Sequence, residues 1–334
     1  MTVQVAFGAR GNGIGAVFGA IVLAALSAAP WWGGRDDLQL LSEIYAYVAL
    51  ASLWNLLAGY AGLVSVGQQA YVGLGAYTLF ALAILFGISP LWAIPLAGLF
   101  AASVSIPVAL LVFRLRGHYF AIGTWNFRLT ASQISALGGG SGTSLPAAVV
   151  IAIAPTRQLR DFTMYWIALL LVVAVLALIV LLLRSRYGLA LKAMRDAELA
   201  AACSGVDVYR TKFLVYVVTA LTTAMLGALI FLQKLRISPD AAFSVNDWTA
   251  FVIFITVIGG IGRIEGPIIG TLVFFALRQT LADLGTIYLM MLGLVAIVIM
   301  LAAPKGIWGM IVERLGWQLF PLERTVLSGE PQQR

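Results

Sequence analysis

Apolar residues run through this chain in long uninterrupted stretches, and the charged residues are confined to short breaks between them. No charged residue occurs between Glu43 and Arg114, a stretch of 70 residues that is long enough for about three helical crossings of a bilayer. Runs such as 91–113 do not alternate apolar with polar residues, as the strands of an outer-membrane barrel do. The pattern therefore predicts helices that span a membrane.

Charged and turn residues divide the chain into ten candidate spans: 14–32, 44–61, 70–88, 91–113, 119–137, 164–183, 213–232, 248–261, 267–283 and 287–303. The segment 248–261 is short for a crossing, and the glycines at its end are able to bend it back into the membrane. The first run follows Arg10 and ends in small residues, as a signal peptide does, but its length favours an uncleaved span. We predict an all-α, polytopic membrane protein with about ten transmembrane helices (eight to ten).

Composition strengthens this prediction. The chain is 61% hydrophobic and only 10% charged, whereas a soluble domain carries roughly 25% charged residues. The net charge of +7 fits basic cytoplasmic loops better than nucleic-acid binding. Cys203 is the single cysteine and His118 the single histidine, so the sequence contains neither an internal disulfide nor a cysteine and histidine cluster for a metal.

The basic residues give an orientation. The loop 184–212 is the most basic segment, which places it in the cytoplasm. With ten spans, both termini are cytoplasmic, and 14 basic residues lie inside against five outside. We therefore predict a single transmembrane domain over 1–312, with a cytoplasmic loop at 184–212 within it, and a cytoplasmic tail over 313–334.

Two glycine-rich stretches interrupt the apolar pattern, at 59–69 and at 259–267. Both precede an apolar run that ends in Phe-Ala-Leu, at 80–82 and 275–277. This similarity indicates an internal repeat, which is common in transporters. The alternative is that glycine is simply frequent in the chain, which has 34 of them.

The segment 186–207 is alanine-rich and charged, and Gly205 suits a helix C-terminal cap. We predict a short cytoplasmic helix over 188–205. Its charges have both signs within two turns, which suits a soluble protein partner better than a helix that lies on anionic lipid. The candidate residues for coupling this helix to such a partner are Lys192, Arg195, Asp196, Glu198 and Gly205.

Four motifs in order resemble the permeases of the high-affinity branched-chain amino acid ABC transporter family. They are Asn55-Leu56-Leu57-Ala58-Gly59-Tyr60-Ala61-Gly62-Leu63 with Gly67 and Gly73; the run Leu115-Arg116-Gly117-His118-Tyr119-Phe120-Ala121-Ile122; the helix at 187–207; and Val257-Ile258-Gly259-Gly260-Ile261-Gly262 with Gly266-Pro267 and Pro304-Lys305-Gly306. The resemblance covers roughly 45–310.

The resemblance implies an importer of the bacterial inner membrane with two permease subunits, usually different from each other, two cytoplasmic ABC ATPase subunits and a periplasmic solute-binding protein. It also implies that the helix at 188–205 sits in a cleft of the ATPase. The chain itself would bind no cofactor, and its partner subunits would use ATP.

The sequence departs from the family at two places near a plausible substrate path. Gln68 and Gln69 follow Gly67, where a histidine is more usual, and Trp125 and Asn126 follow Thr124 in place of small residues. We predict that these four residues and Tyr71 lie near the translocation path. The departures leave the solute open between branched-chain or other amino acids and the urea, amides or aromatic acids of related carriers.

Function follows from what the chain carries and what it lacks. It has no Gly-x-x-x-x-Gly-Lys-Ser/Thr motif, so it would draw on ATP only through another chain. We expect a transport subunit and not an enzyme. The main rival is a secondary transporter or channel that acts alone, but such a protein would carry acidic relays in its spans.

Arg128 and Arg278 lie inside apolar runs and either snorkel or face a path. The outer loop 138–161 either receives a binding protein or is a plain connector.

Overall fold

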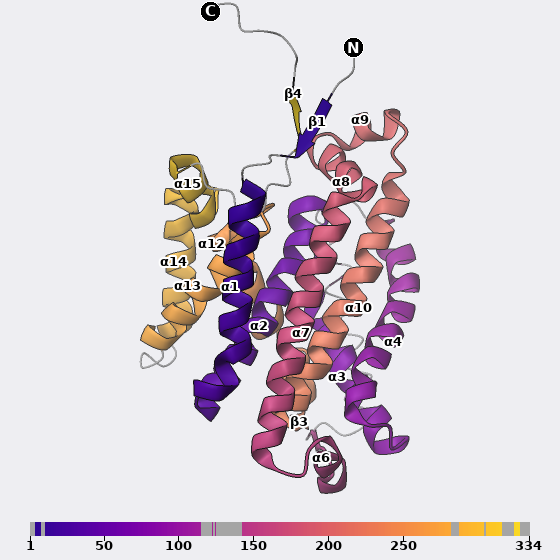
Figure 1. The fold of residues 1–334 in the computed structure, drawn as a ribbon. Helices are drawn as coiled ribbons and strands as arrows, with labels where there is room; N and C mark the ends of the chain where they lie inside the picture. Colours follow the sequence, from indigo (N-terminus) through magenta and orange to yellow (C-terminus); the bar gives the residue numbers. More distant parts are fainter. Residues whose placement is uncertain are drawn as a thin grey trace, which may run out of the picture.

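A computed structural model describes residues 4–7, 11–114, 122, 124, 142–281, 287–303, 305–315 and 324–327. Its long helices stand roughly side by side in one bundle (Figure 1). In chain order the elements are β1 (Gln4–Phe7), α1 (Gly11–Trp32), α2 (Arg35–Asn55), η1 (Leu56–Tyr60), α3 (Gln68–Leu85), α4 (Pro90–Val112), β2 (Thr143–Ser144), α6 (Ala147–Ile153), α7 (Arg157–Arg184), α8 (Arg186–Asp196), α9 (Glu198–Cys203), α10 (Val208–Lys234), β3 (Arg236–Ile237), α11 (Pro239–Ala242), η2 (Asn246–Ala250), α12 (Phe251–Gly259), α13 (Glu265–Leu281), α14 (Ile287–Ala302), α15 (Gly306–Leu315) and β4 (Arg324–Leu327).

Seven segments of the described chain are long and apolar enough to cross a membrane: Arg35–Tyr60, Gln68–Leu85, Pro90–Val112, Arg157–Arg184, Val208–Lys234, Pro239–Gly259 and Met290–Val312. The described apolar part of α1 and the 17-residue α13 are shorter. The predicted helical, polytopic membrane fold is therefore confirmed. The predicted span 119–137 lies almost entirely outside the described residues.

Two small sheets are the exception to the predicted all-α fold. The strands β1 and β4 pair antiparallel, with Gln4 opposite Leu327, and so join the two ends of the chain. The strands β2 and β3 pair at the opposite end of the bundle, with Thr143 opposite Ile237. In Figure 1, β1 and β4 lie at the end that carries α8 and α9, whereas β3 and α6 lie at the other end.

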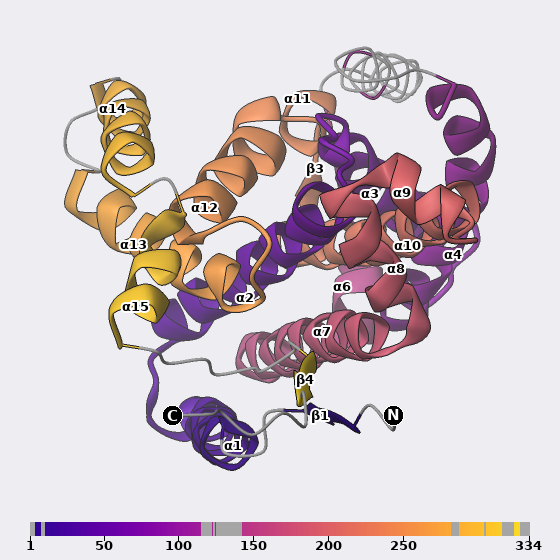
Figure 2. The same ribbon diagram turned by 90° about the horizontal axis from the view of Figure 1, so that it is seen from above.

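Helix α2 is the centre of the bundle. All its residues from Tyr45 to Asn55 are buried, because α7, α10, α12 and α13 pack around it. The view from above shows α2 between the α12–α13 pair and helices α7 and α10 (Figure 2). A helix that is apolar on every side is buried either among other helices or in lipid, and the four neighbours of α2 show that it lies among helices. By contrast, α4 and α14 expose large aliphatic side chains such as Leu99, Leu111 and Leu301, as helices in contact with lipid do.

Glycine sets the distance between α3 and α10. A Cβ on Gly75 would come within 2.0 Å of the Ala224 carbonyl oxygen, and one on Gly227 within 2.2 Å of the Val72 carbonyl oxygen. Lipid supplies no hydrophobic force between helices, so they associate by close contact at small residues. These two glycines are what lets the two backbones touch.

We expect Gly75→Ala and Gly227→Ala each to destabilise the protein by about 1–3 kcal/mol, since the added methyl group overlaps backbone atoms. The measurement is the thermal unfolding midpoint in detergent. Gly293→Ala is the matched control, because nothing lies within 4 Å of a Cβ at that helical position. Its midpoint should stay level or rise, since alanine favours helix. Equal midpoints for Gly75→Ala and Gly293→Ala would contradict the close-packing account.

Candidate functional site

The helix predicted over 188–205 is present but is divided in two. Ala197 has an extended backbone, so α8 ends at Asp196 and α9 begins at Glu198. An acidic residue in the first turn of a helix is favourable, which suits Glu198 to its position. Neither glycine nor proline marks this break in the sequence, so only the structure reveals it. We call α8 and α9 together the coupling unit, after the role that the sequence predicts for this segment.

Both ends of the coupling unit are held by local hydrogen bonds. At its start, Ser185 caps α8 by accepting from the Tyr187 backbone N–H at 3.2 Å. At its end, Gly205 has a positive φ of 87° and donates to the Ala202 carbonyl oxygen, while Val206 donates to the Ala201 carbonyl oxygen. This is the Schellman arrangement, which favours glycine. The predicted role of Gly205 as a helix cap is confirmed.

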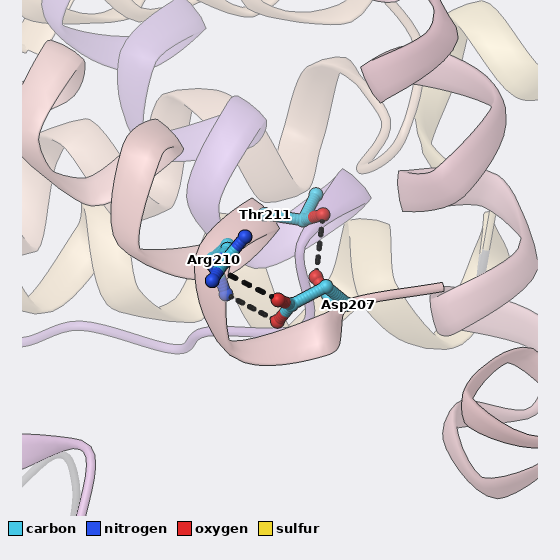
Figure 3. A network of polar contacts seen from close by, with 3 residues as sticks. All are labelled: Asp207, Arg210 and Thr211. Atoms are coloured by element: carbon cyan, nitrogen blue, oxygen red, sulfur yellow. Dashed lines mark hydrogen bonds and ion pairs between the residues drawn. The ribbon is translucent and has the colours of Figure 1, made fainter. Parts of the chain in front are cut away.

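The start of α10 has its own capping contacts and one ion pair to the unit. Asp207 accepts a hydrogen bond from the Arg210 backbone N–H and forms an ion pair with its side chain, both at 3.0 Å, while Thr211 donates to the Asp207 carbonyl oxygen (Figure 3). Lys212 also donates to Glu198 at 2.7 Å. Glu198, one of the predicted coupling residues, thus ties α9 to α10.

The coupling unit is amphipathic in a way that charge alone did not reveal. Leu191 and Met194 of α8 and Ala201 of α9 are buried against the bundle. On the free side, Leu189 is 55% exposed and Leu199 is 85% exposed. The charges alone did not predict these two exposed leucines. Each lies two residues from a buried position, Leu191 or Ala201, and that spacing places it on the opposite face of a helix.

A clasp joins the two glycine-rich stretches. The Asn55 side chain at the end of α2 accepts from the Gly262 backbone N–H at 2.7 Å and donates to the Arg263 carbonyl oxygen at 2.8 Å. Gly262, with a φ of 80°, lies so close that a Cβ on Gly59 would come within 2.7 Å of its nitrogen. The two stretches therefore pack on each other, whether or not they form an internal repeat.

The coupling unit rests on this clasp. A Cβ on Gly262 would come within 2.9 Å of the Arg195 Nη1, so the guanidinium of α8 lies against the α12–α13 turn. Helix α8 also packs on η1. Of the other predicted coupling residues, Lys192 is half-buried on α8, and the side chain of Asp196 lies outside what the structure describes.

Three of the predicted path residues lie inside the bundle. Gln68 donates to the Leu50 carbonyl oxygen at 3.0 Å, Gln69 accepts from Thr249, and the hydroxyl of Tyr71 donates to that of Tyr216 at 3.0 Å. Trp125 and Asn126 lie outside the described residues.

Several buried polar atoms near these helices make no hydrogen bond within the described part of the chain. They are Gln68 Oε1, Gln69 Nε2 and the hydroxyls of Ser52, Thr219 and Thr223. Each such atom costs about 1–3 kcal/mol unless water or a solute satisfies it. They lie on α2, α3 and α10, which pack together, so the bundle has a polar interior. Of these residues, the sequence analysis predicted only the two glutamines.

Arg278 has a defined partner. It donates to Glu43 at 2.7 Å and lies over the Phe275 ring. Each side chain of the pair is 42% exposed, so the charge is paired at the bundle surface. Arg128 lies outside the described residues.

A sequence model of a family described as the permease component of the branched-chain amino acid transport system matches residues 38–304. The chain belongs to this family. The permease is 28% identical over 300 residues to the high-affinity branched-chain amino acid transport system permease protein LivM of Escherichia coli, an alignment that covers 82% of this chain and 70% of that protein. The LivM protein of Salmonella typhimurium is 27% identical over 304 residues, covering 83% and 71% of the two chains.

A shorter match joins the permease to a sugar carrier. It is 33% identical over 138 residues to the ribose import permease protein RbsC of Bacillus subtilis, covering 40% of this chain and 43% of that protein. No solved structure matches the permease. The family resemblance inferred from the sequence motifs is confirmed.

We expect Asn55→Ala to loosen the α12–α13 turn of the permease, because the substitution leaves the Gly262 N–H and the Arg263 carbonyl without their partner. Trypsin added to purified protein should cleave after Arg263 several-fold faster than in the wild type. The matched control is Asn246→Ala, since Asn246 is exposed. An unchanged cleavage rate in Asn55→Ala would show that the clasp does not hold the turn.

Proposed function

We propose that the permease is the transmembrane subunit of an ATP-driven importer for branched-chain amino acids in the bacterial inner membrane. The family match over 38–304 carries the proposal. The relatives named LivM support the solute class. As a permease of this family the chain is a multi-pass transport subunit, and the chemistry of ATP belongs to separate subunits, since the sequence has no phosphate-binding loop.

We further propose that the coupling unit docks on a cytoplasmic ABC ATPase. Leu189 and Leu199 supply an exposed apolar surface beside the charges of Lys192 and Arg195, a combination suited to a groove in a protein. The buried face of the unit and the contact between Arg195 and Gly262 connect it to the bundle. A displacement of α8 by the ATPase would therefore act on the clasp at Asn55 and on the end of α2.

We expect Leu199→Asp to abolish ATP-driven uptake while the protein still inserts and folds, because Leu199 is 85% exposed and contributes little to the core. Leu199→Met is the control and should transport normally, since it keeps an apolar side chain. This is a sharper test than reversing the charges of Arg195, Asp196 and Glu198 together, because Glu198 also pairs with Lys212. Normal uptake by Leu199→Asp would refute docking through this surface.

The remaining features of the proposal concern the assembly. We place the coupling unit and both termini in the cytoplasm, with eight to ten spans, because the basic loop 184–212 and the β1–β4 pair lie at one end of the bundle. A second, related permease and a periplasmic binding protein complete the importer. The exposed aliphatic faces of α4 and α14 suit lipid or that second permease.

Reconstitution tests the assembly. The purified permease alone in liposomes, under an imposed ion gradient, should move no leucine, because it has no energy source of its own. Adding the ATPase subunits, the second permease, the binding protein and ATP should give leucine uptake. Ribose and urea belong in the same panel, and uptake of either instead of leucine would change the solute. Gradient-driven leucine uptake by the permease alone would refute the proposal in favour of a secondary transporter.

A further inference from the structure

A charged cavity of about 510 Å³ lies between α2, α7, α10, η2 and α13, at the end of the bundle away from the coupling unit. Small-molecule sites commonly have volumes of about 300–1,000 Å³, so one amino acid would fit. By the proposed orientation, this end faces outward. The charged side chains that line the cavity are Arg35, Arg160, Lys234, Arg278, Glu43 and Asp161.

Two ion pairs account for both carboxylates. Arg35 lies 2.9 Å from Asp161 and ties α2 to α7, while Arg278 lies 2.7 Å from Glu43 and ties α13 to α2. Two of the four cations are thereby neutralised. The described lining keeps a net charge of about +2, carried by Arg160 and Lys234.

Neither of these two cations has an acidic partner within the described part of the chain. Arg160 is half-buried in the first turn of α7. The Lys234 ammonium lies over the rings of Phe231 and Trp248, at 5.4 and 5.1 Å from their centroids. Ring faces attract a cation but accept no strong hydrogen bond, so the ammonium keeps donors for another group.

The same cavity has an apolar wall. Tyr47 and Trp248 stack with centroids 6.1 Å apart, and both line the cavity together with Ile230 and Leu232. An aromatic and aliphatic wall beside two cations is complementary to a molecule with a carboxylate at one end and a hydrocarbon chain at the other.

We propose that this cavity is a binding site of the permease for the carboxylate of its solute, with Arg160 and Lys234 as the carboxylate ligands. The site rests on the proposed import of amino acids and specifies how the solute is recognised. Charge-assisted hydrogen bonds from a guanidinium and an ammonium hold the carboxylate, and the wall of Tyr47 and Trp248 receives the branched side chain.

The position of the cavity connects it with the polar interior. Trp248 lines the cavity, and the next residue, Thr249, donates to Gln69 inside the bundle. Both residues belong to η2, a π-helical turn, and such turns are frequent at functional sites. A solute in the cavity is therefore separated from the predicted path residue Gln69 by a single irregular turn.

The test is equilibrium binding of radiolabelled L-leucine to the assembled importer in phosphatidylcholine nanodiscs, without binding protein or nucleotide. Arg160→Gln and Lys234→Gln should each raise the dissociation constant about tenfold or more, and Arg160→Lys should recover part of the loss. Arg157→Gln and Arg236→Gln are matched controls, because both residues are exposed, lie near the cavity and do not line it. Thermal unfolding midpoints identify any variant that has lost its fold.

Competition between ligands identifies which group of leucine the cavity binds. 4-Methylpentanoate, which keeps the carboxylate, should displace leucine, and leucinamide, which lacks it, should not. Wild-type affinity in both Gln variants, equal competition by leucinamide, or no saturable binding to the wild type would each overturn the site. Loss of leucine binding on adding phosphatidylglycerol would assign the cations to a lipid headgroup and overturn it as well. ATP-driven leucine uptake that persists alongside any of these results would leave the proposed function standing.

Discussion

The whole bundle depends on close contact between helices in lipid, a solvent that supplies no hydrophobic force to hold them together. Lipid is as apolar as leucine, so contact between helices must come from dense packing and from internal hydrogen bonds. Gly75 and Gly227 bring α3 and α10 into backbone contact in the interior, and Gly59 and Gly262 do the same where α2 meets the α12–α13 turn. At the second place Asn55 adds two hydrogen bonds to backbone groups that neither α2 nor the turn satisfies by itself.

Helix α2 links the two ends of the molecule. Its first half carries Arg35 and Glu43, which form the ion pairs at the charged cavity, and its last residue is Asn55 of the clasp. Between them it is buried, so one continuous helix joins the cavity to the turn on which Arg195 of the coupling unit rests. In the importer we propose, this gives a physical route from ATPase docking to the solute site.

Irregular backbone occurs at three places along this route. The π-turns η1 and η2 lie at the end of α2 and at the start of α12, one beside the clasp and the other between the cavity and Gln69. At the third place the extended backbone of Ala197 divides the coupling unit into α8 and α9. Only η1 has a sequence signal, since it contains Gly59 of the first glycine-rich stretch. Neither η2 nor Ala197 is marked by glycine or proline.

The sequence by itself determined the helical membrane fold, the end of the coupling unit at Gly205 and the family. Long apolar runs that do not alternate have no stable structure in lipid other than a helix. A glycine cap depends only on neighbouring residues, and the family is identified by motifs that can be read directly from the sequence. Only the tertiary structure decided that the two glycine-rich stretches meet, that Glu198 pairs with Lys212 while Leu199 stays exposed, and that Arg278 pairs with Glu43. It also brought Arg160 of α7 and Lys234 of α10 to one cavity. These are contacts between residues far apart in the chain, and no local pattern of apolar and polar residues encodes which faces of the helices meet.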